Sequence, residues 1–233
     1  MDLAKIKQLP VPRVLVPILL ATAAAWGFIE IADEVAEGET RVIDEWIVLA
    51  MRTSDTRDPI GPAWFEEAMR DLTALGSTLV LSMVVLTAVG FLLFVRHWRA
   101  AIFTFLASVS GQLVSHLLKE GFSRPRPDLI PHEVAVFTHS FPSGHAMMSA
   151  VVYLTLASLA ARLMHRRQLK VYALSVAIVF TILIGASRVY LGVHWPSDVL
   201  AGWMIGASWA LACWLVAANL GLGRNGSGTA RTL

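Results

Sequence analysis

Nearly all of the residues in this sequence that could perform chemistry lie in three short segments. The segments are 119–127, 141–145 and 187–198, and each lies where a long apolar stretch begins or ends. They hold four cations and few carboxylates, although ionised groups beside a bilayer are costly unless they pair or bind something. Arginine matches phosphate oxygens with two parallel hydrogen bonds, and lysine adds a point charge. The surplus of positive charge therefore predicts an anion site built from Lys119, Arg124, Arg126 and Arg188.

The middle segment, Pro-Ser-Gly-His at 142–145, stands where an apolar helix is expected to begin. The first N–H groups of a helix have no partners within the helix and can bind an anion. Gly144 would let the backbone approach that anion closely, and Ser143 would either bond a phosphate oxygen or simply cap the helix. His145 could give a proton to a leaving alkoxide.

The last segment holds a histidine and an aspartate, His194 and Asp198, four residues apart. In a turn or at the start of a helix, this spacing lets the carboxylate reach the imidazole. The aspartate would then fix the tautomer of the ring and make its other nitrogen more nucleophilic. Histidine can form covalent intermediates, and positive groups stabilise the charge on a phosphoryl group during its transfer. These residue types indicate phosphoryl transfer through His194.

A metal site is the alternative use of the histidines in this region. The spacing of the candidate ligands is not that of a compact zinc motif, and a cationic pocket repels a metal ion. A two-metal phosphatase also needs several bridging carboxylates. We therefore expect neither a metal ion nor any other cofactor. The candidate ligands are His132, His139, His145, His194 and Asp198.

His116 lies inside an apolar stretch, where we expect a hydrogen-bonded core residue or a helper beside the site.

The chain as a whole has the composition of a membrane protein. Of its 233 residues, 56% are hydrophobic and 15% are charged, whereas soluble domains carry about 25% charged residues. Six apolar stretches reach the roughly 20 residues that a helix needs to cross the bilayer core, and they lack the two-residue alternation of a barrel. The expected fold class is all-α: a polytopic membrane protein with a six-transmembrane-helix bundle and a short amphipathic helical segment in the first outer loop. The expected spans are 14–32, 75–95, 100–118, 146–164, 171–190 and 199–220.

The first outer loop, 33–74, contains two stretches whose apolar residues recur at helical spacing. We expect two short amphipathic helices on the outer membrane surface. They would serve either as a lid or packing element, or as a rim where lipid enters the site. We expect residues 1–220 to form one domain that includes this loop, and the Gly-rich 221–233 to be a disordered cytoplasmic tail. The apolar residues are Ile43, Trp46, Ile47, Ala50 and Met51 in the first stretch, and Trp64, Phe65, Ala68, Met69 and Leu72 in the second.

The distribution of basic residues predicts the orientation in the membrane. With the N-terminus in the cytoplasm, 11 of the 19 Lys and Arg residues fall in inner segments, as the positive-inside rule requires. Both termini are then cytoplasmic, and the three chemical segments face the extracytoplasmic side of the cell (plasma or inner) membrane. The net charge of +2 gives no reason to expect a nucleic acid. The expected partners are the bilayer and a phosphate-bearing substrate.

Taken together, the three segments resemble the signature of the type 2 phosphatidic acid phosphatase superfamily, in its membrane lipid phosphatase branch. That signature is Lys, six residues and Arg-Pro; then Pro-Ser-Gly-His; then Ser-Arg, five residues, His, three residues and Asp. Every position matches, and the resemblance covers roughly 75–220. It implies that His194 is a nucleophile that forms a phosphohistidine, that Asp198 orients it, and that His145 is the general acid and then the base. It also implies metal independence and a phosphate cradle of Lys119, Arg126, Ser143, Gly144 and Arg188.

Arg124 is outside this signature, and it would either contact the substrate or face lipid headgroups. The function implied is that of a lipid phosphate or pyrophosphate phosphatase at the outer membrane face. Its substrate would be undecaprenyl pyrophosphate, or a diacyl lipid phosphate such as phosphatidic acid or phosphatidylglycerol phosphate.

Three other functions compete with this interpretation. A lipid-to-lipid phosphotransferase would use the same residues. A transporter places its polar groups near the bilayer midplane, whereas these segments lie at the ends of spans. The soluble haloperoxidases of the superfamily bind vanadate in the same cradle, a role that six spans disfavour.

Overall fold

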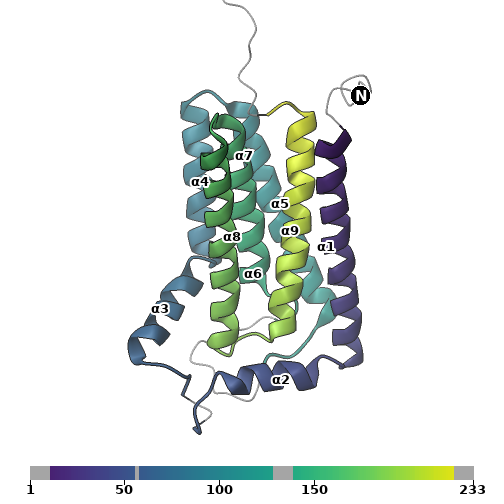
Figure 1. Ribbon diagram of the computed structural model, residues 1–233, viewed down its shortest axis with the longest axis vertical. Coiled ribbons are helices and arrows are strands. Elements are labelled where there is room, and N and C mark those ends of the chain that lie inside the picture. Colours follow the sequence, from purple (N-terminus) through teal and green to yellow (C-terminus); the bar gives the residue numbers. More distant parts are fainter. Residues whose placement is uncertain (1–10, 56–57, 128–138, 223–233) are drawn as a thin grey trace, which may run out of the picture.

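The computed structural model describes residues 11–55, 58–127 and 139–222, and the regular elements in these ranges are helices (Figure 1). Long helices stand side by side as a bundle, and two short helices lie at one end of it. One of the bundle helices is built from three consecutive parts, with a π-helical turn between two α-helical parts. The bundle contains α1 (Val11–Glu37), α4 (Thr78–Phe94), α5 (Trp98–Phe122), α6 (Gly144–Ser149) with η2 (Ala150–Leu154) and α7 (Thr155–Leu163), α8 (Arg167–Tyr190) and α9 (Pro196–Asn219).

These helices confirm the predicted fold class. Among the described residues, five segments are each long and apolar enough to cross a membrane: α1, α5, the run from α6 to α7, α8 and α9. The sixth is a bent pair, in which α3 (Ala63–Ala74) and α4 meet at an angle of 51°. The predicted span 75–95 was therefore placed correctly, but its outer end continues into α3 through this bend.

The bend between α3 and α4 is packed beside a predicted site residue. A Cβ atom on Gly76 would lie 2.4 Å from Cγ2 of Ile184 and 3.2 Å from Cδ2 of His145. The chain can therefore pass this close to α8 and α6 only with a residue that lacks a side chain. Ser77 then caps α4, because its Oγ accepts a hydrogen bond from the N–H of Val80 at 3.3 Å.

Helix α9 approaches the start of α6 unusually closely, and two glycines make this possible. A Cβ atom on Gly202 would lie 2.7 Å from the carbonyl oxygen of Ser143, and one on Gly206 would lie 2.6 Å from that of Met147. Phe141 is fully buried against Phe28 and Phe122, with ring centroids 5.9 and 4.8 Å apart. Backbone contact and aromatic packing together fix residues 141–147 in the bundle.

The two amphipathic helices predicted in the first outer loop are present as α2 (Arg41–Ala50) and α3. Helix α2 lies across the end of the bundle, beneath the start of α9 (Figure 1). Val48 and the acidic Asp44 are its buried residues, whereas Ile43 and Trp46 are exposed. The side of α2 that faces the protein is thus partly polar, which differs from a simple division into an apolar inner face and a polar outer face.

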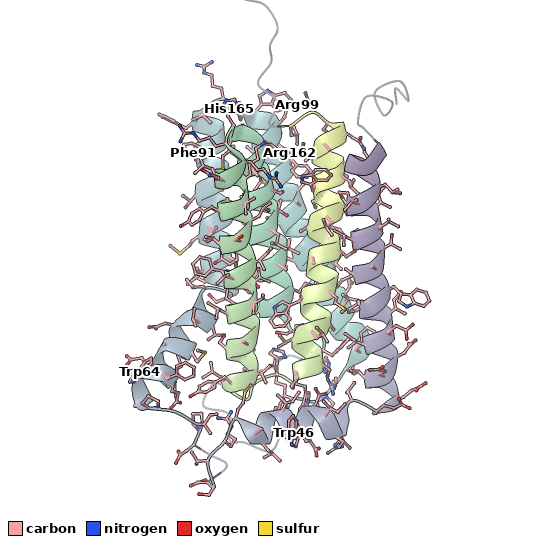
Figure 2. All side chains as sticks on the ribbon, in the orientation of Figure 1. Trp46, Trp64, Phe91, Arg99, Arg162 and His165 are labelled. Carbon is pink, nitrogen blue, oxygen red and sulfur yellow. The ribbon has the colours of Figure 1, made fainter. Side chains whose placement is uncertain are left out.

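The described chain begins and ends at the same end of the bundle. Helix α1 begins and α9 ends at the same end (Figure 1), where Arg99, Arg162 and His165 also lie, opposite Trp46 (Figure 2). The predicted tail, 221–233, lies outside the described residues from 223 onward. The division into one domain and a tail remains a prediction.

Candidate active site

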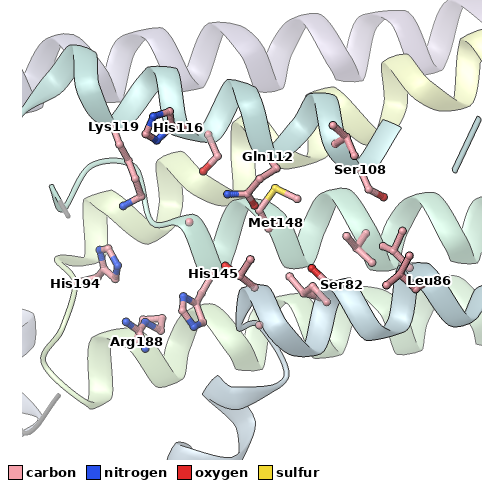
Figure 3. A pocket seen from close by; sticks show the side chains of 18 of the residues that line it. Ser82, Leu86, Ser108, Gln112, His116, Lys119, His145, Met148, Arg188 and His194 are labelled. Carbon is pink, nitrogen blue, oxygen red and sulfur yellow. The ribbon is translucent and has the colours of Figure 1, made fainter. Parts of the chain in front are cut away.

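Six of the eight predicted site residues line one cavity of about 560 Å³. The ends of separate helices deliver them: Lys119 comes from α5, His145 from α6 and Arg188 from α8. Figure 3 shows these three side chains and His194 gathered at one end of the cavity. The remaining two residues, Ser143 and Asp198, are fully buried beside it. The cavity residues are Lys119, Arg126, Gly144, His145, Arg188 and His194.

The hydrogen bonds of His194 define its tautomer. Its Nδ1 lies 3.3 Å from Oδ2 of Asp198, and its Nε2 lies 3.1 Å from Nη1 of Arg126. A guanidinium can only donate, so Nε2 must be the acceptor and the ring proton must be on Nδ1, facing the carboxylate. The arrangement leaves the lone pair of Nε2 on the side of Arg126 and the cavity.

His194 is also held in its uncharged form. It is 1% exposed, and burial lowers its pKa to about 3, against the hydrogen bond and the charge of Asp198, which raise it. The charges of Arg188 and Arg126 lower the pKa further. The ring is therefore neutral near pH 7, as a nucleophilic nitrogen must be.

The carboxylate of Asp198 is positioned from several sides. Its Oδ2 accepts hydrogen bonds from the backbone N–H of Trp195 at 2.9 Å and from the hydroxyl of Ser140, and its Oδ1 accepts one from Arg124 at 2.6 Å. Trp195 precedes α9, so Asp198 also closes the first turn of that helix. Asp198 is held firmly because it serves both the helix and the histidine.

The cations have unequal sets of partners. Nζ of Lys119 donates to the carbonyl of His139 at 2.8 Å, and Nη1 of Arg188 donates to Oγ1 of Thr73 at 3.0 Å. Among the described residues, the buried Nε of Arg188 has no hydrogen-bond partner. A buried donor without a partner costs about 1–3 kcal/mol, so an anion in the cavity would relieve that cost.

Ser143 and Gly144 occupy the start of α6, as predicted. The hydroxyl of Ser143 accepts from the N–H of Ala146 at 3.5 Å, a long capping hydrogen bond. A Cβ atom on Gly144 would lie 3.3 Å from Cε of Lys119, so a larger residue would press on the lysine stem. The structure thus shows Ser143 as a helix cap, and its contact with phosphate remains a prediction.

Within the described ranges, no three His, Cys, Asp or Glu side chains gather in a way that could hold a metal ion. His132, one of the candidate ligands considered, lies outside the described residues. The metal-free mechanism remains a prediction.

The structure bears on the alternatives for two residues. Arg124 is not among the residues that line the cavity; its side chain is 13% exposed and forms ion pairs with Asp44 and Asp198. His116 is exposed and lines the cavity, which fits a helper beside the site and not a core residue.

Sequence reasoning missed Ser140 and Asp44 altogether. Both lie outside the signature segments. The signal that was available for Asp44 was an acidic residue between apolar ones on an amphipathic helix, a pattern shared by many surface helices.

Comparisons with known proteins point to one family. A family model described as the PAP2 superfamily matches residues 100–221. The chain is 36% identical to phosphatidylglycerophosphatase B of Bacillus subtilis strain 168 over 149 residues, which is 61% of this chain and 70% of that protein. It is 31% identical to an undecaprenyl-diphosphatase of Sulfolobus acidocaldarius over 135 residues, 58% of this chain and 51% of that protein.

The fold also resembles a solved structure. The crystal structure of a transmembrane PAP2 type phosphatidylglycerolphosphate phosphatase from Bacillus subtilis superposes with a TM-score of 0.74 and 30% sequence identity. The superposition covers 83% of this chain and 93% of that one.

The partnerless Nε of Arg188 predicts that the site binds a phosphate-like anion. Inorganic phosphate should raise the unfolding temperature of the detergent-solubilised protein relative to sodium chloride of equal ionic strength. At ten times its dissociation constant, a ligand adds about 1.4 kcal/mol, or a shift of roughly 3–6 °C for a protein of this size. Arg188→Gln should reduce that shift, whereas Arg99→Gln, at the other end of the bundle, should keep it. Equal shifts in both variants would exclude Arg188 from the anion site.

Proposed function

The chain belongs to the PAP2 superfamily, and from this premise we propose that it is a metal-independent lipid phosphate phosphatase that works through a phosphohistidine at His194. The observation that carries the proposal is the state of that side chain. His194 is buried and neutral, its proton faces Asp198, and its Nε2 faces a cavity lined by Lys119 and Arg188. These are the requirements for attack on a phosphate that the cations hold in place.

In the first half of the proposed reaction, Nε2 of His194 attacks the phosphorus atom of the substrate. A nitrogen–phosphorus bond forms, and the bond from phosphorus to the lipid oxygen breaks. His145 gives a proton to the leaving lipid oxygen, which departs as an alcohol when the substrate is a monoester. The ring becomes positively charged on phosphorylation, and Asp198 stabilises that charge through the Nδ1 proton.

In the second half, water attacks the phosphohistidine. His145, now unprotonated, accepts a proton from the water, and inorganic phosphate leaves as His194 returns to its neutral form. Lys119, Arg126 and Arg188 stabilise the charge on the phosphoryl oxygens in both halves, together with the N–H groups at the start of α6.

The cavity continues away from the cations between α4 and α5, and its lining suggests the class of lipid. Gln112 lies two turns before Lys119 on α5, about 10 Å along the helix, and Figure 3 shows it pointing toward the centre of the cavity. Gln112 and His116 are both exposed and both line this part of the cavity. Apolar side chains, including Leu86 and Val109, line the rest.

We propose that the phosphate binds at the cations, that the polar part linking it to the chains lies beside Gln112 and His116, and that the chains follow the apolar lining. A diacyl glycerol-based lipid phosphate, such as phosphatidylglycerol phosphate or phosphatidic acid, has such a polar linker. Undecaprenyl pyrophosphate is the second candidate, and the similarity to an undecaprenyl-diphosphatase supports it. Its hydrocarbon begins directly after the diphosphate, so it would leave the amide of Gln112 without a partner.

We also propose that the cavity opens on the extracytoplasmic side of the cell membrane and that both termini are cytoplasmic. The bundle end opposite the cavity residues carries Arg99 and Arg162, as the cytoplasmic side should.

The proposed nucleophile predicts the effect of its removal. His194→Ala should abolish release of inorganic phosphate from a diacyl lipid phosphate while the unfolding temperature stays close to that of the unchanged protein. EDTA should leave the activity of the unchanged protein intact. Retained turnover in His194→Ala would exclude this nucleophile, and activity lost to EDTA and restored by Mg²⁺ or Zn²⁺ would exclude the metal-free mechanism.

The polar lining predicts a substrate-dependent effect of Gln112→Leu, which keeps the size of the side chain and removes the amide. The KM for phosphatidylglycerol phosphate should rise about tenfold, the effect of one lost hydrogen bond of about 1.4 kcal/mol. Turnover of undecaprenyl pyrophosphate should change little. If the unchanged protein strongly prefers the polyprenyl substrate, the second candidate is correct. Loss of lipid phosphate without free phosphate would indicate transfer to another lipid.

The orientation predicts which loops a membrane-impermeant thiol reagent can reach. In a Cys213→Ala background, Ser54→Cys between α2 and α3 should be labelled in intact cells, because residue 54 is exposed at the cavity end. His165→Cys, exposed between α7 and α8, should be labelled only after the membrane is opened. The reverse result would place the site on the cytoplasmic side.

A further inference from the structure

A chain of alternating charges runs from Asp198 to the helix that crosses the end of the bundle. Arg124 lies between two carboxylates: its Nη1 donates to Oδ1 of Asp198 at 2.6 Å, and its Nη2 donates to Oδ2 of Asp44 at 2.8 Å. The two carboxylate side chains are 0% and 3% exposed. Asp44 belongs to α2 and Asp198 to α9. The two residues lie 154 positions apart in the sequence, and this guanidinium joins their helices.

We propose that Arg124 and Asp44 are positioning residues, which hold the Asp198 carboxylate in the orientation that keeps the proton of His194 on Nδ1. This inference rests on the proposed role of His194 as the nucleophile. It assigns a function to two residues outside the family signature.

The hydrogen bonds of Arg124 leave it no part in binding the substrate. Its Nη1 also donates to the hydroxyl of Ser197 at 2.8 Å, and its Nη2 to that of Thr40 at 3.1 Å. Its guanidinium lies over the ring of Trp195, with its carbon 5.7 Å from the ring centroid. Arg124 is not among the residues that line the cavity. Its charge is therefore directed at the two carboxylates.

The position of Arg124 determines which oxygen of Asp198 faces the histidine. Because Arg124 binds Oδ1, the carboxylate presents Oδ2 to Nδ1 of His194 and to the N–H of Trp195. A carboxylate without this constraint could rotate or turn away, and the ring proton could then move to Nε2. That tautomer has no lone pair at the nitrogen that would attack phosphorus.

Asp44 fixes the other end of this chain of charges. Its Oδ1 accepts from the backbone N–H of Ser197 at 2.9 Å, and its Oδ2 accepts from the hydroxyl of the same residue. Ser197 lies in the first turn of α9, where unpaired N–H groups favour a negative charge. Asp44 therefore anchors the turn that carries Asp198 and also supplies the second counter-charge of Arg124. Without Arg124, two buried carboxylates would share this region with no cation between them, an arrangement that is strongly unfavourable.

The test compares Arg124→Gln and Asp44→Asn with Asp198→Asn, using purified protein and a diacyl lipid phosphate. At metal sites, a residue that orients a ligand through one intermediate contact changes affinity or activity about 10- to 100-fold, and we expect the same range for a residue that orients Asp198. Arg124→Gln should lower kcat in that range with KM changed less than about threefold, the same pattern as Asp198→Asn. Arg124→Lys should restore part of the loss, because it returns the charge without the two-sided hydrogen bonding.

Arg124 and Asp44 should also behave as one unit. Asp44→Asn should lower kcat less than Arg124→Gln does, and the double variant should be no slower than Arg124→Gln alone, because the second change removes a partner that is already lost. Glu45→Gln is the matched control: it removes the exposed pair between Arg41 and Glu45 on the same helix and should leave kcat unchanged.

Other results would overturn the inference. A raised KM with unchanged kcat in Arg124→Gln would make Arg124 a substrate contact. A loss of activity that matches the loss of folded protein, with normal turnover in the folded fraction, would make the chain of charges merely structural. Full activity of Arg124→Gln alongside an inactive His194→Ala would reject the inference and leave the proposed function standing. An active His194→Ala would reject both.

Discussion

The contact between the buried carboxylate of Asp198 and the ring of His194 is the interaction on which the rest of the structure depends. A carboxylate with no exposed surface at the edge of a bilayer is stable only when every oxygen has a partner. Its partners are Trp195 just before α9, Ser140 before α6 and Arg124 after α5. Pairing this one charge therefore brings three separate parts of the chain together, and with them the ends of the helices to which they are attached.

The opposite side of the His194 ring faces cations instead of a carboxylate. Arg126 donates to its Nε2, and Lys119 and Arg188 line the same cavity. Within the described part of the chain, the buried Nε of Arg188 has no hydrogen-bond partner. One side of the ring is thus fully paired and rigid, whereas the other is short of negative charge. This asymmetry is what a site for phosphate transfer needs, because the transferred group supplies the missing charge only when it is bound.

Much of this architecture could be predicted from the sequence. Apolar stretches of span length predicted the bundle, and helical spacing in 33–74 predicted α2 and α3. That Lys119, His145, Arg188 and His194 converge was indicated by their position at span ends on one side of the membrane and by the resemblance to the family signature. The boundary between the amphipathic stretch and the span at 75 was predicted, but the bend of 51° between α3 and α4 was not, because a sequence pattern does not report the direction in which the chain continues after a break. The partners of Arg124 were also missed. Asp44 and Ser197 are 153 residues apart, and no local periodicity reports a contact of that range.

Because the ends of helices position the site residues, the thickness of the bilayer affects the geometry of the reaction. Lys119, Arg188 and Asp198 lie within the last or first turns of α5, α8 and α9, so their relative heights depend on how those helices tilt. Helices adjust their tilt to the hydrocarbon thickness around them, at modest cost. A membrane that is too thin or too thick would therefore shift the cations relative to the nucleophile along the bilayer normal. Such a displacement would change the alignment of the reacting atoms without any change of sequence.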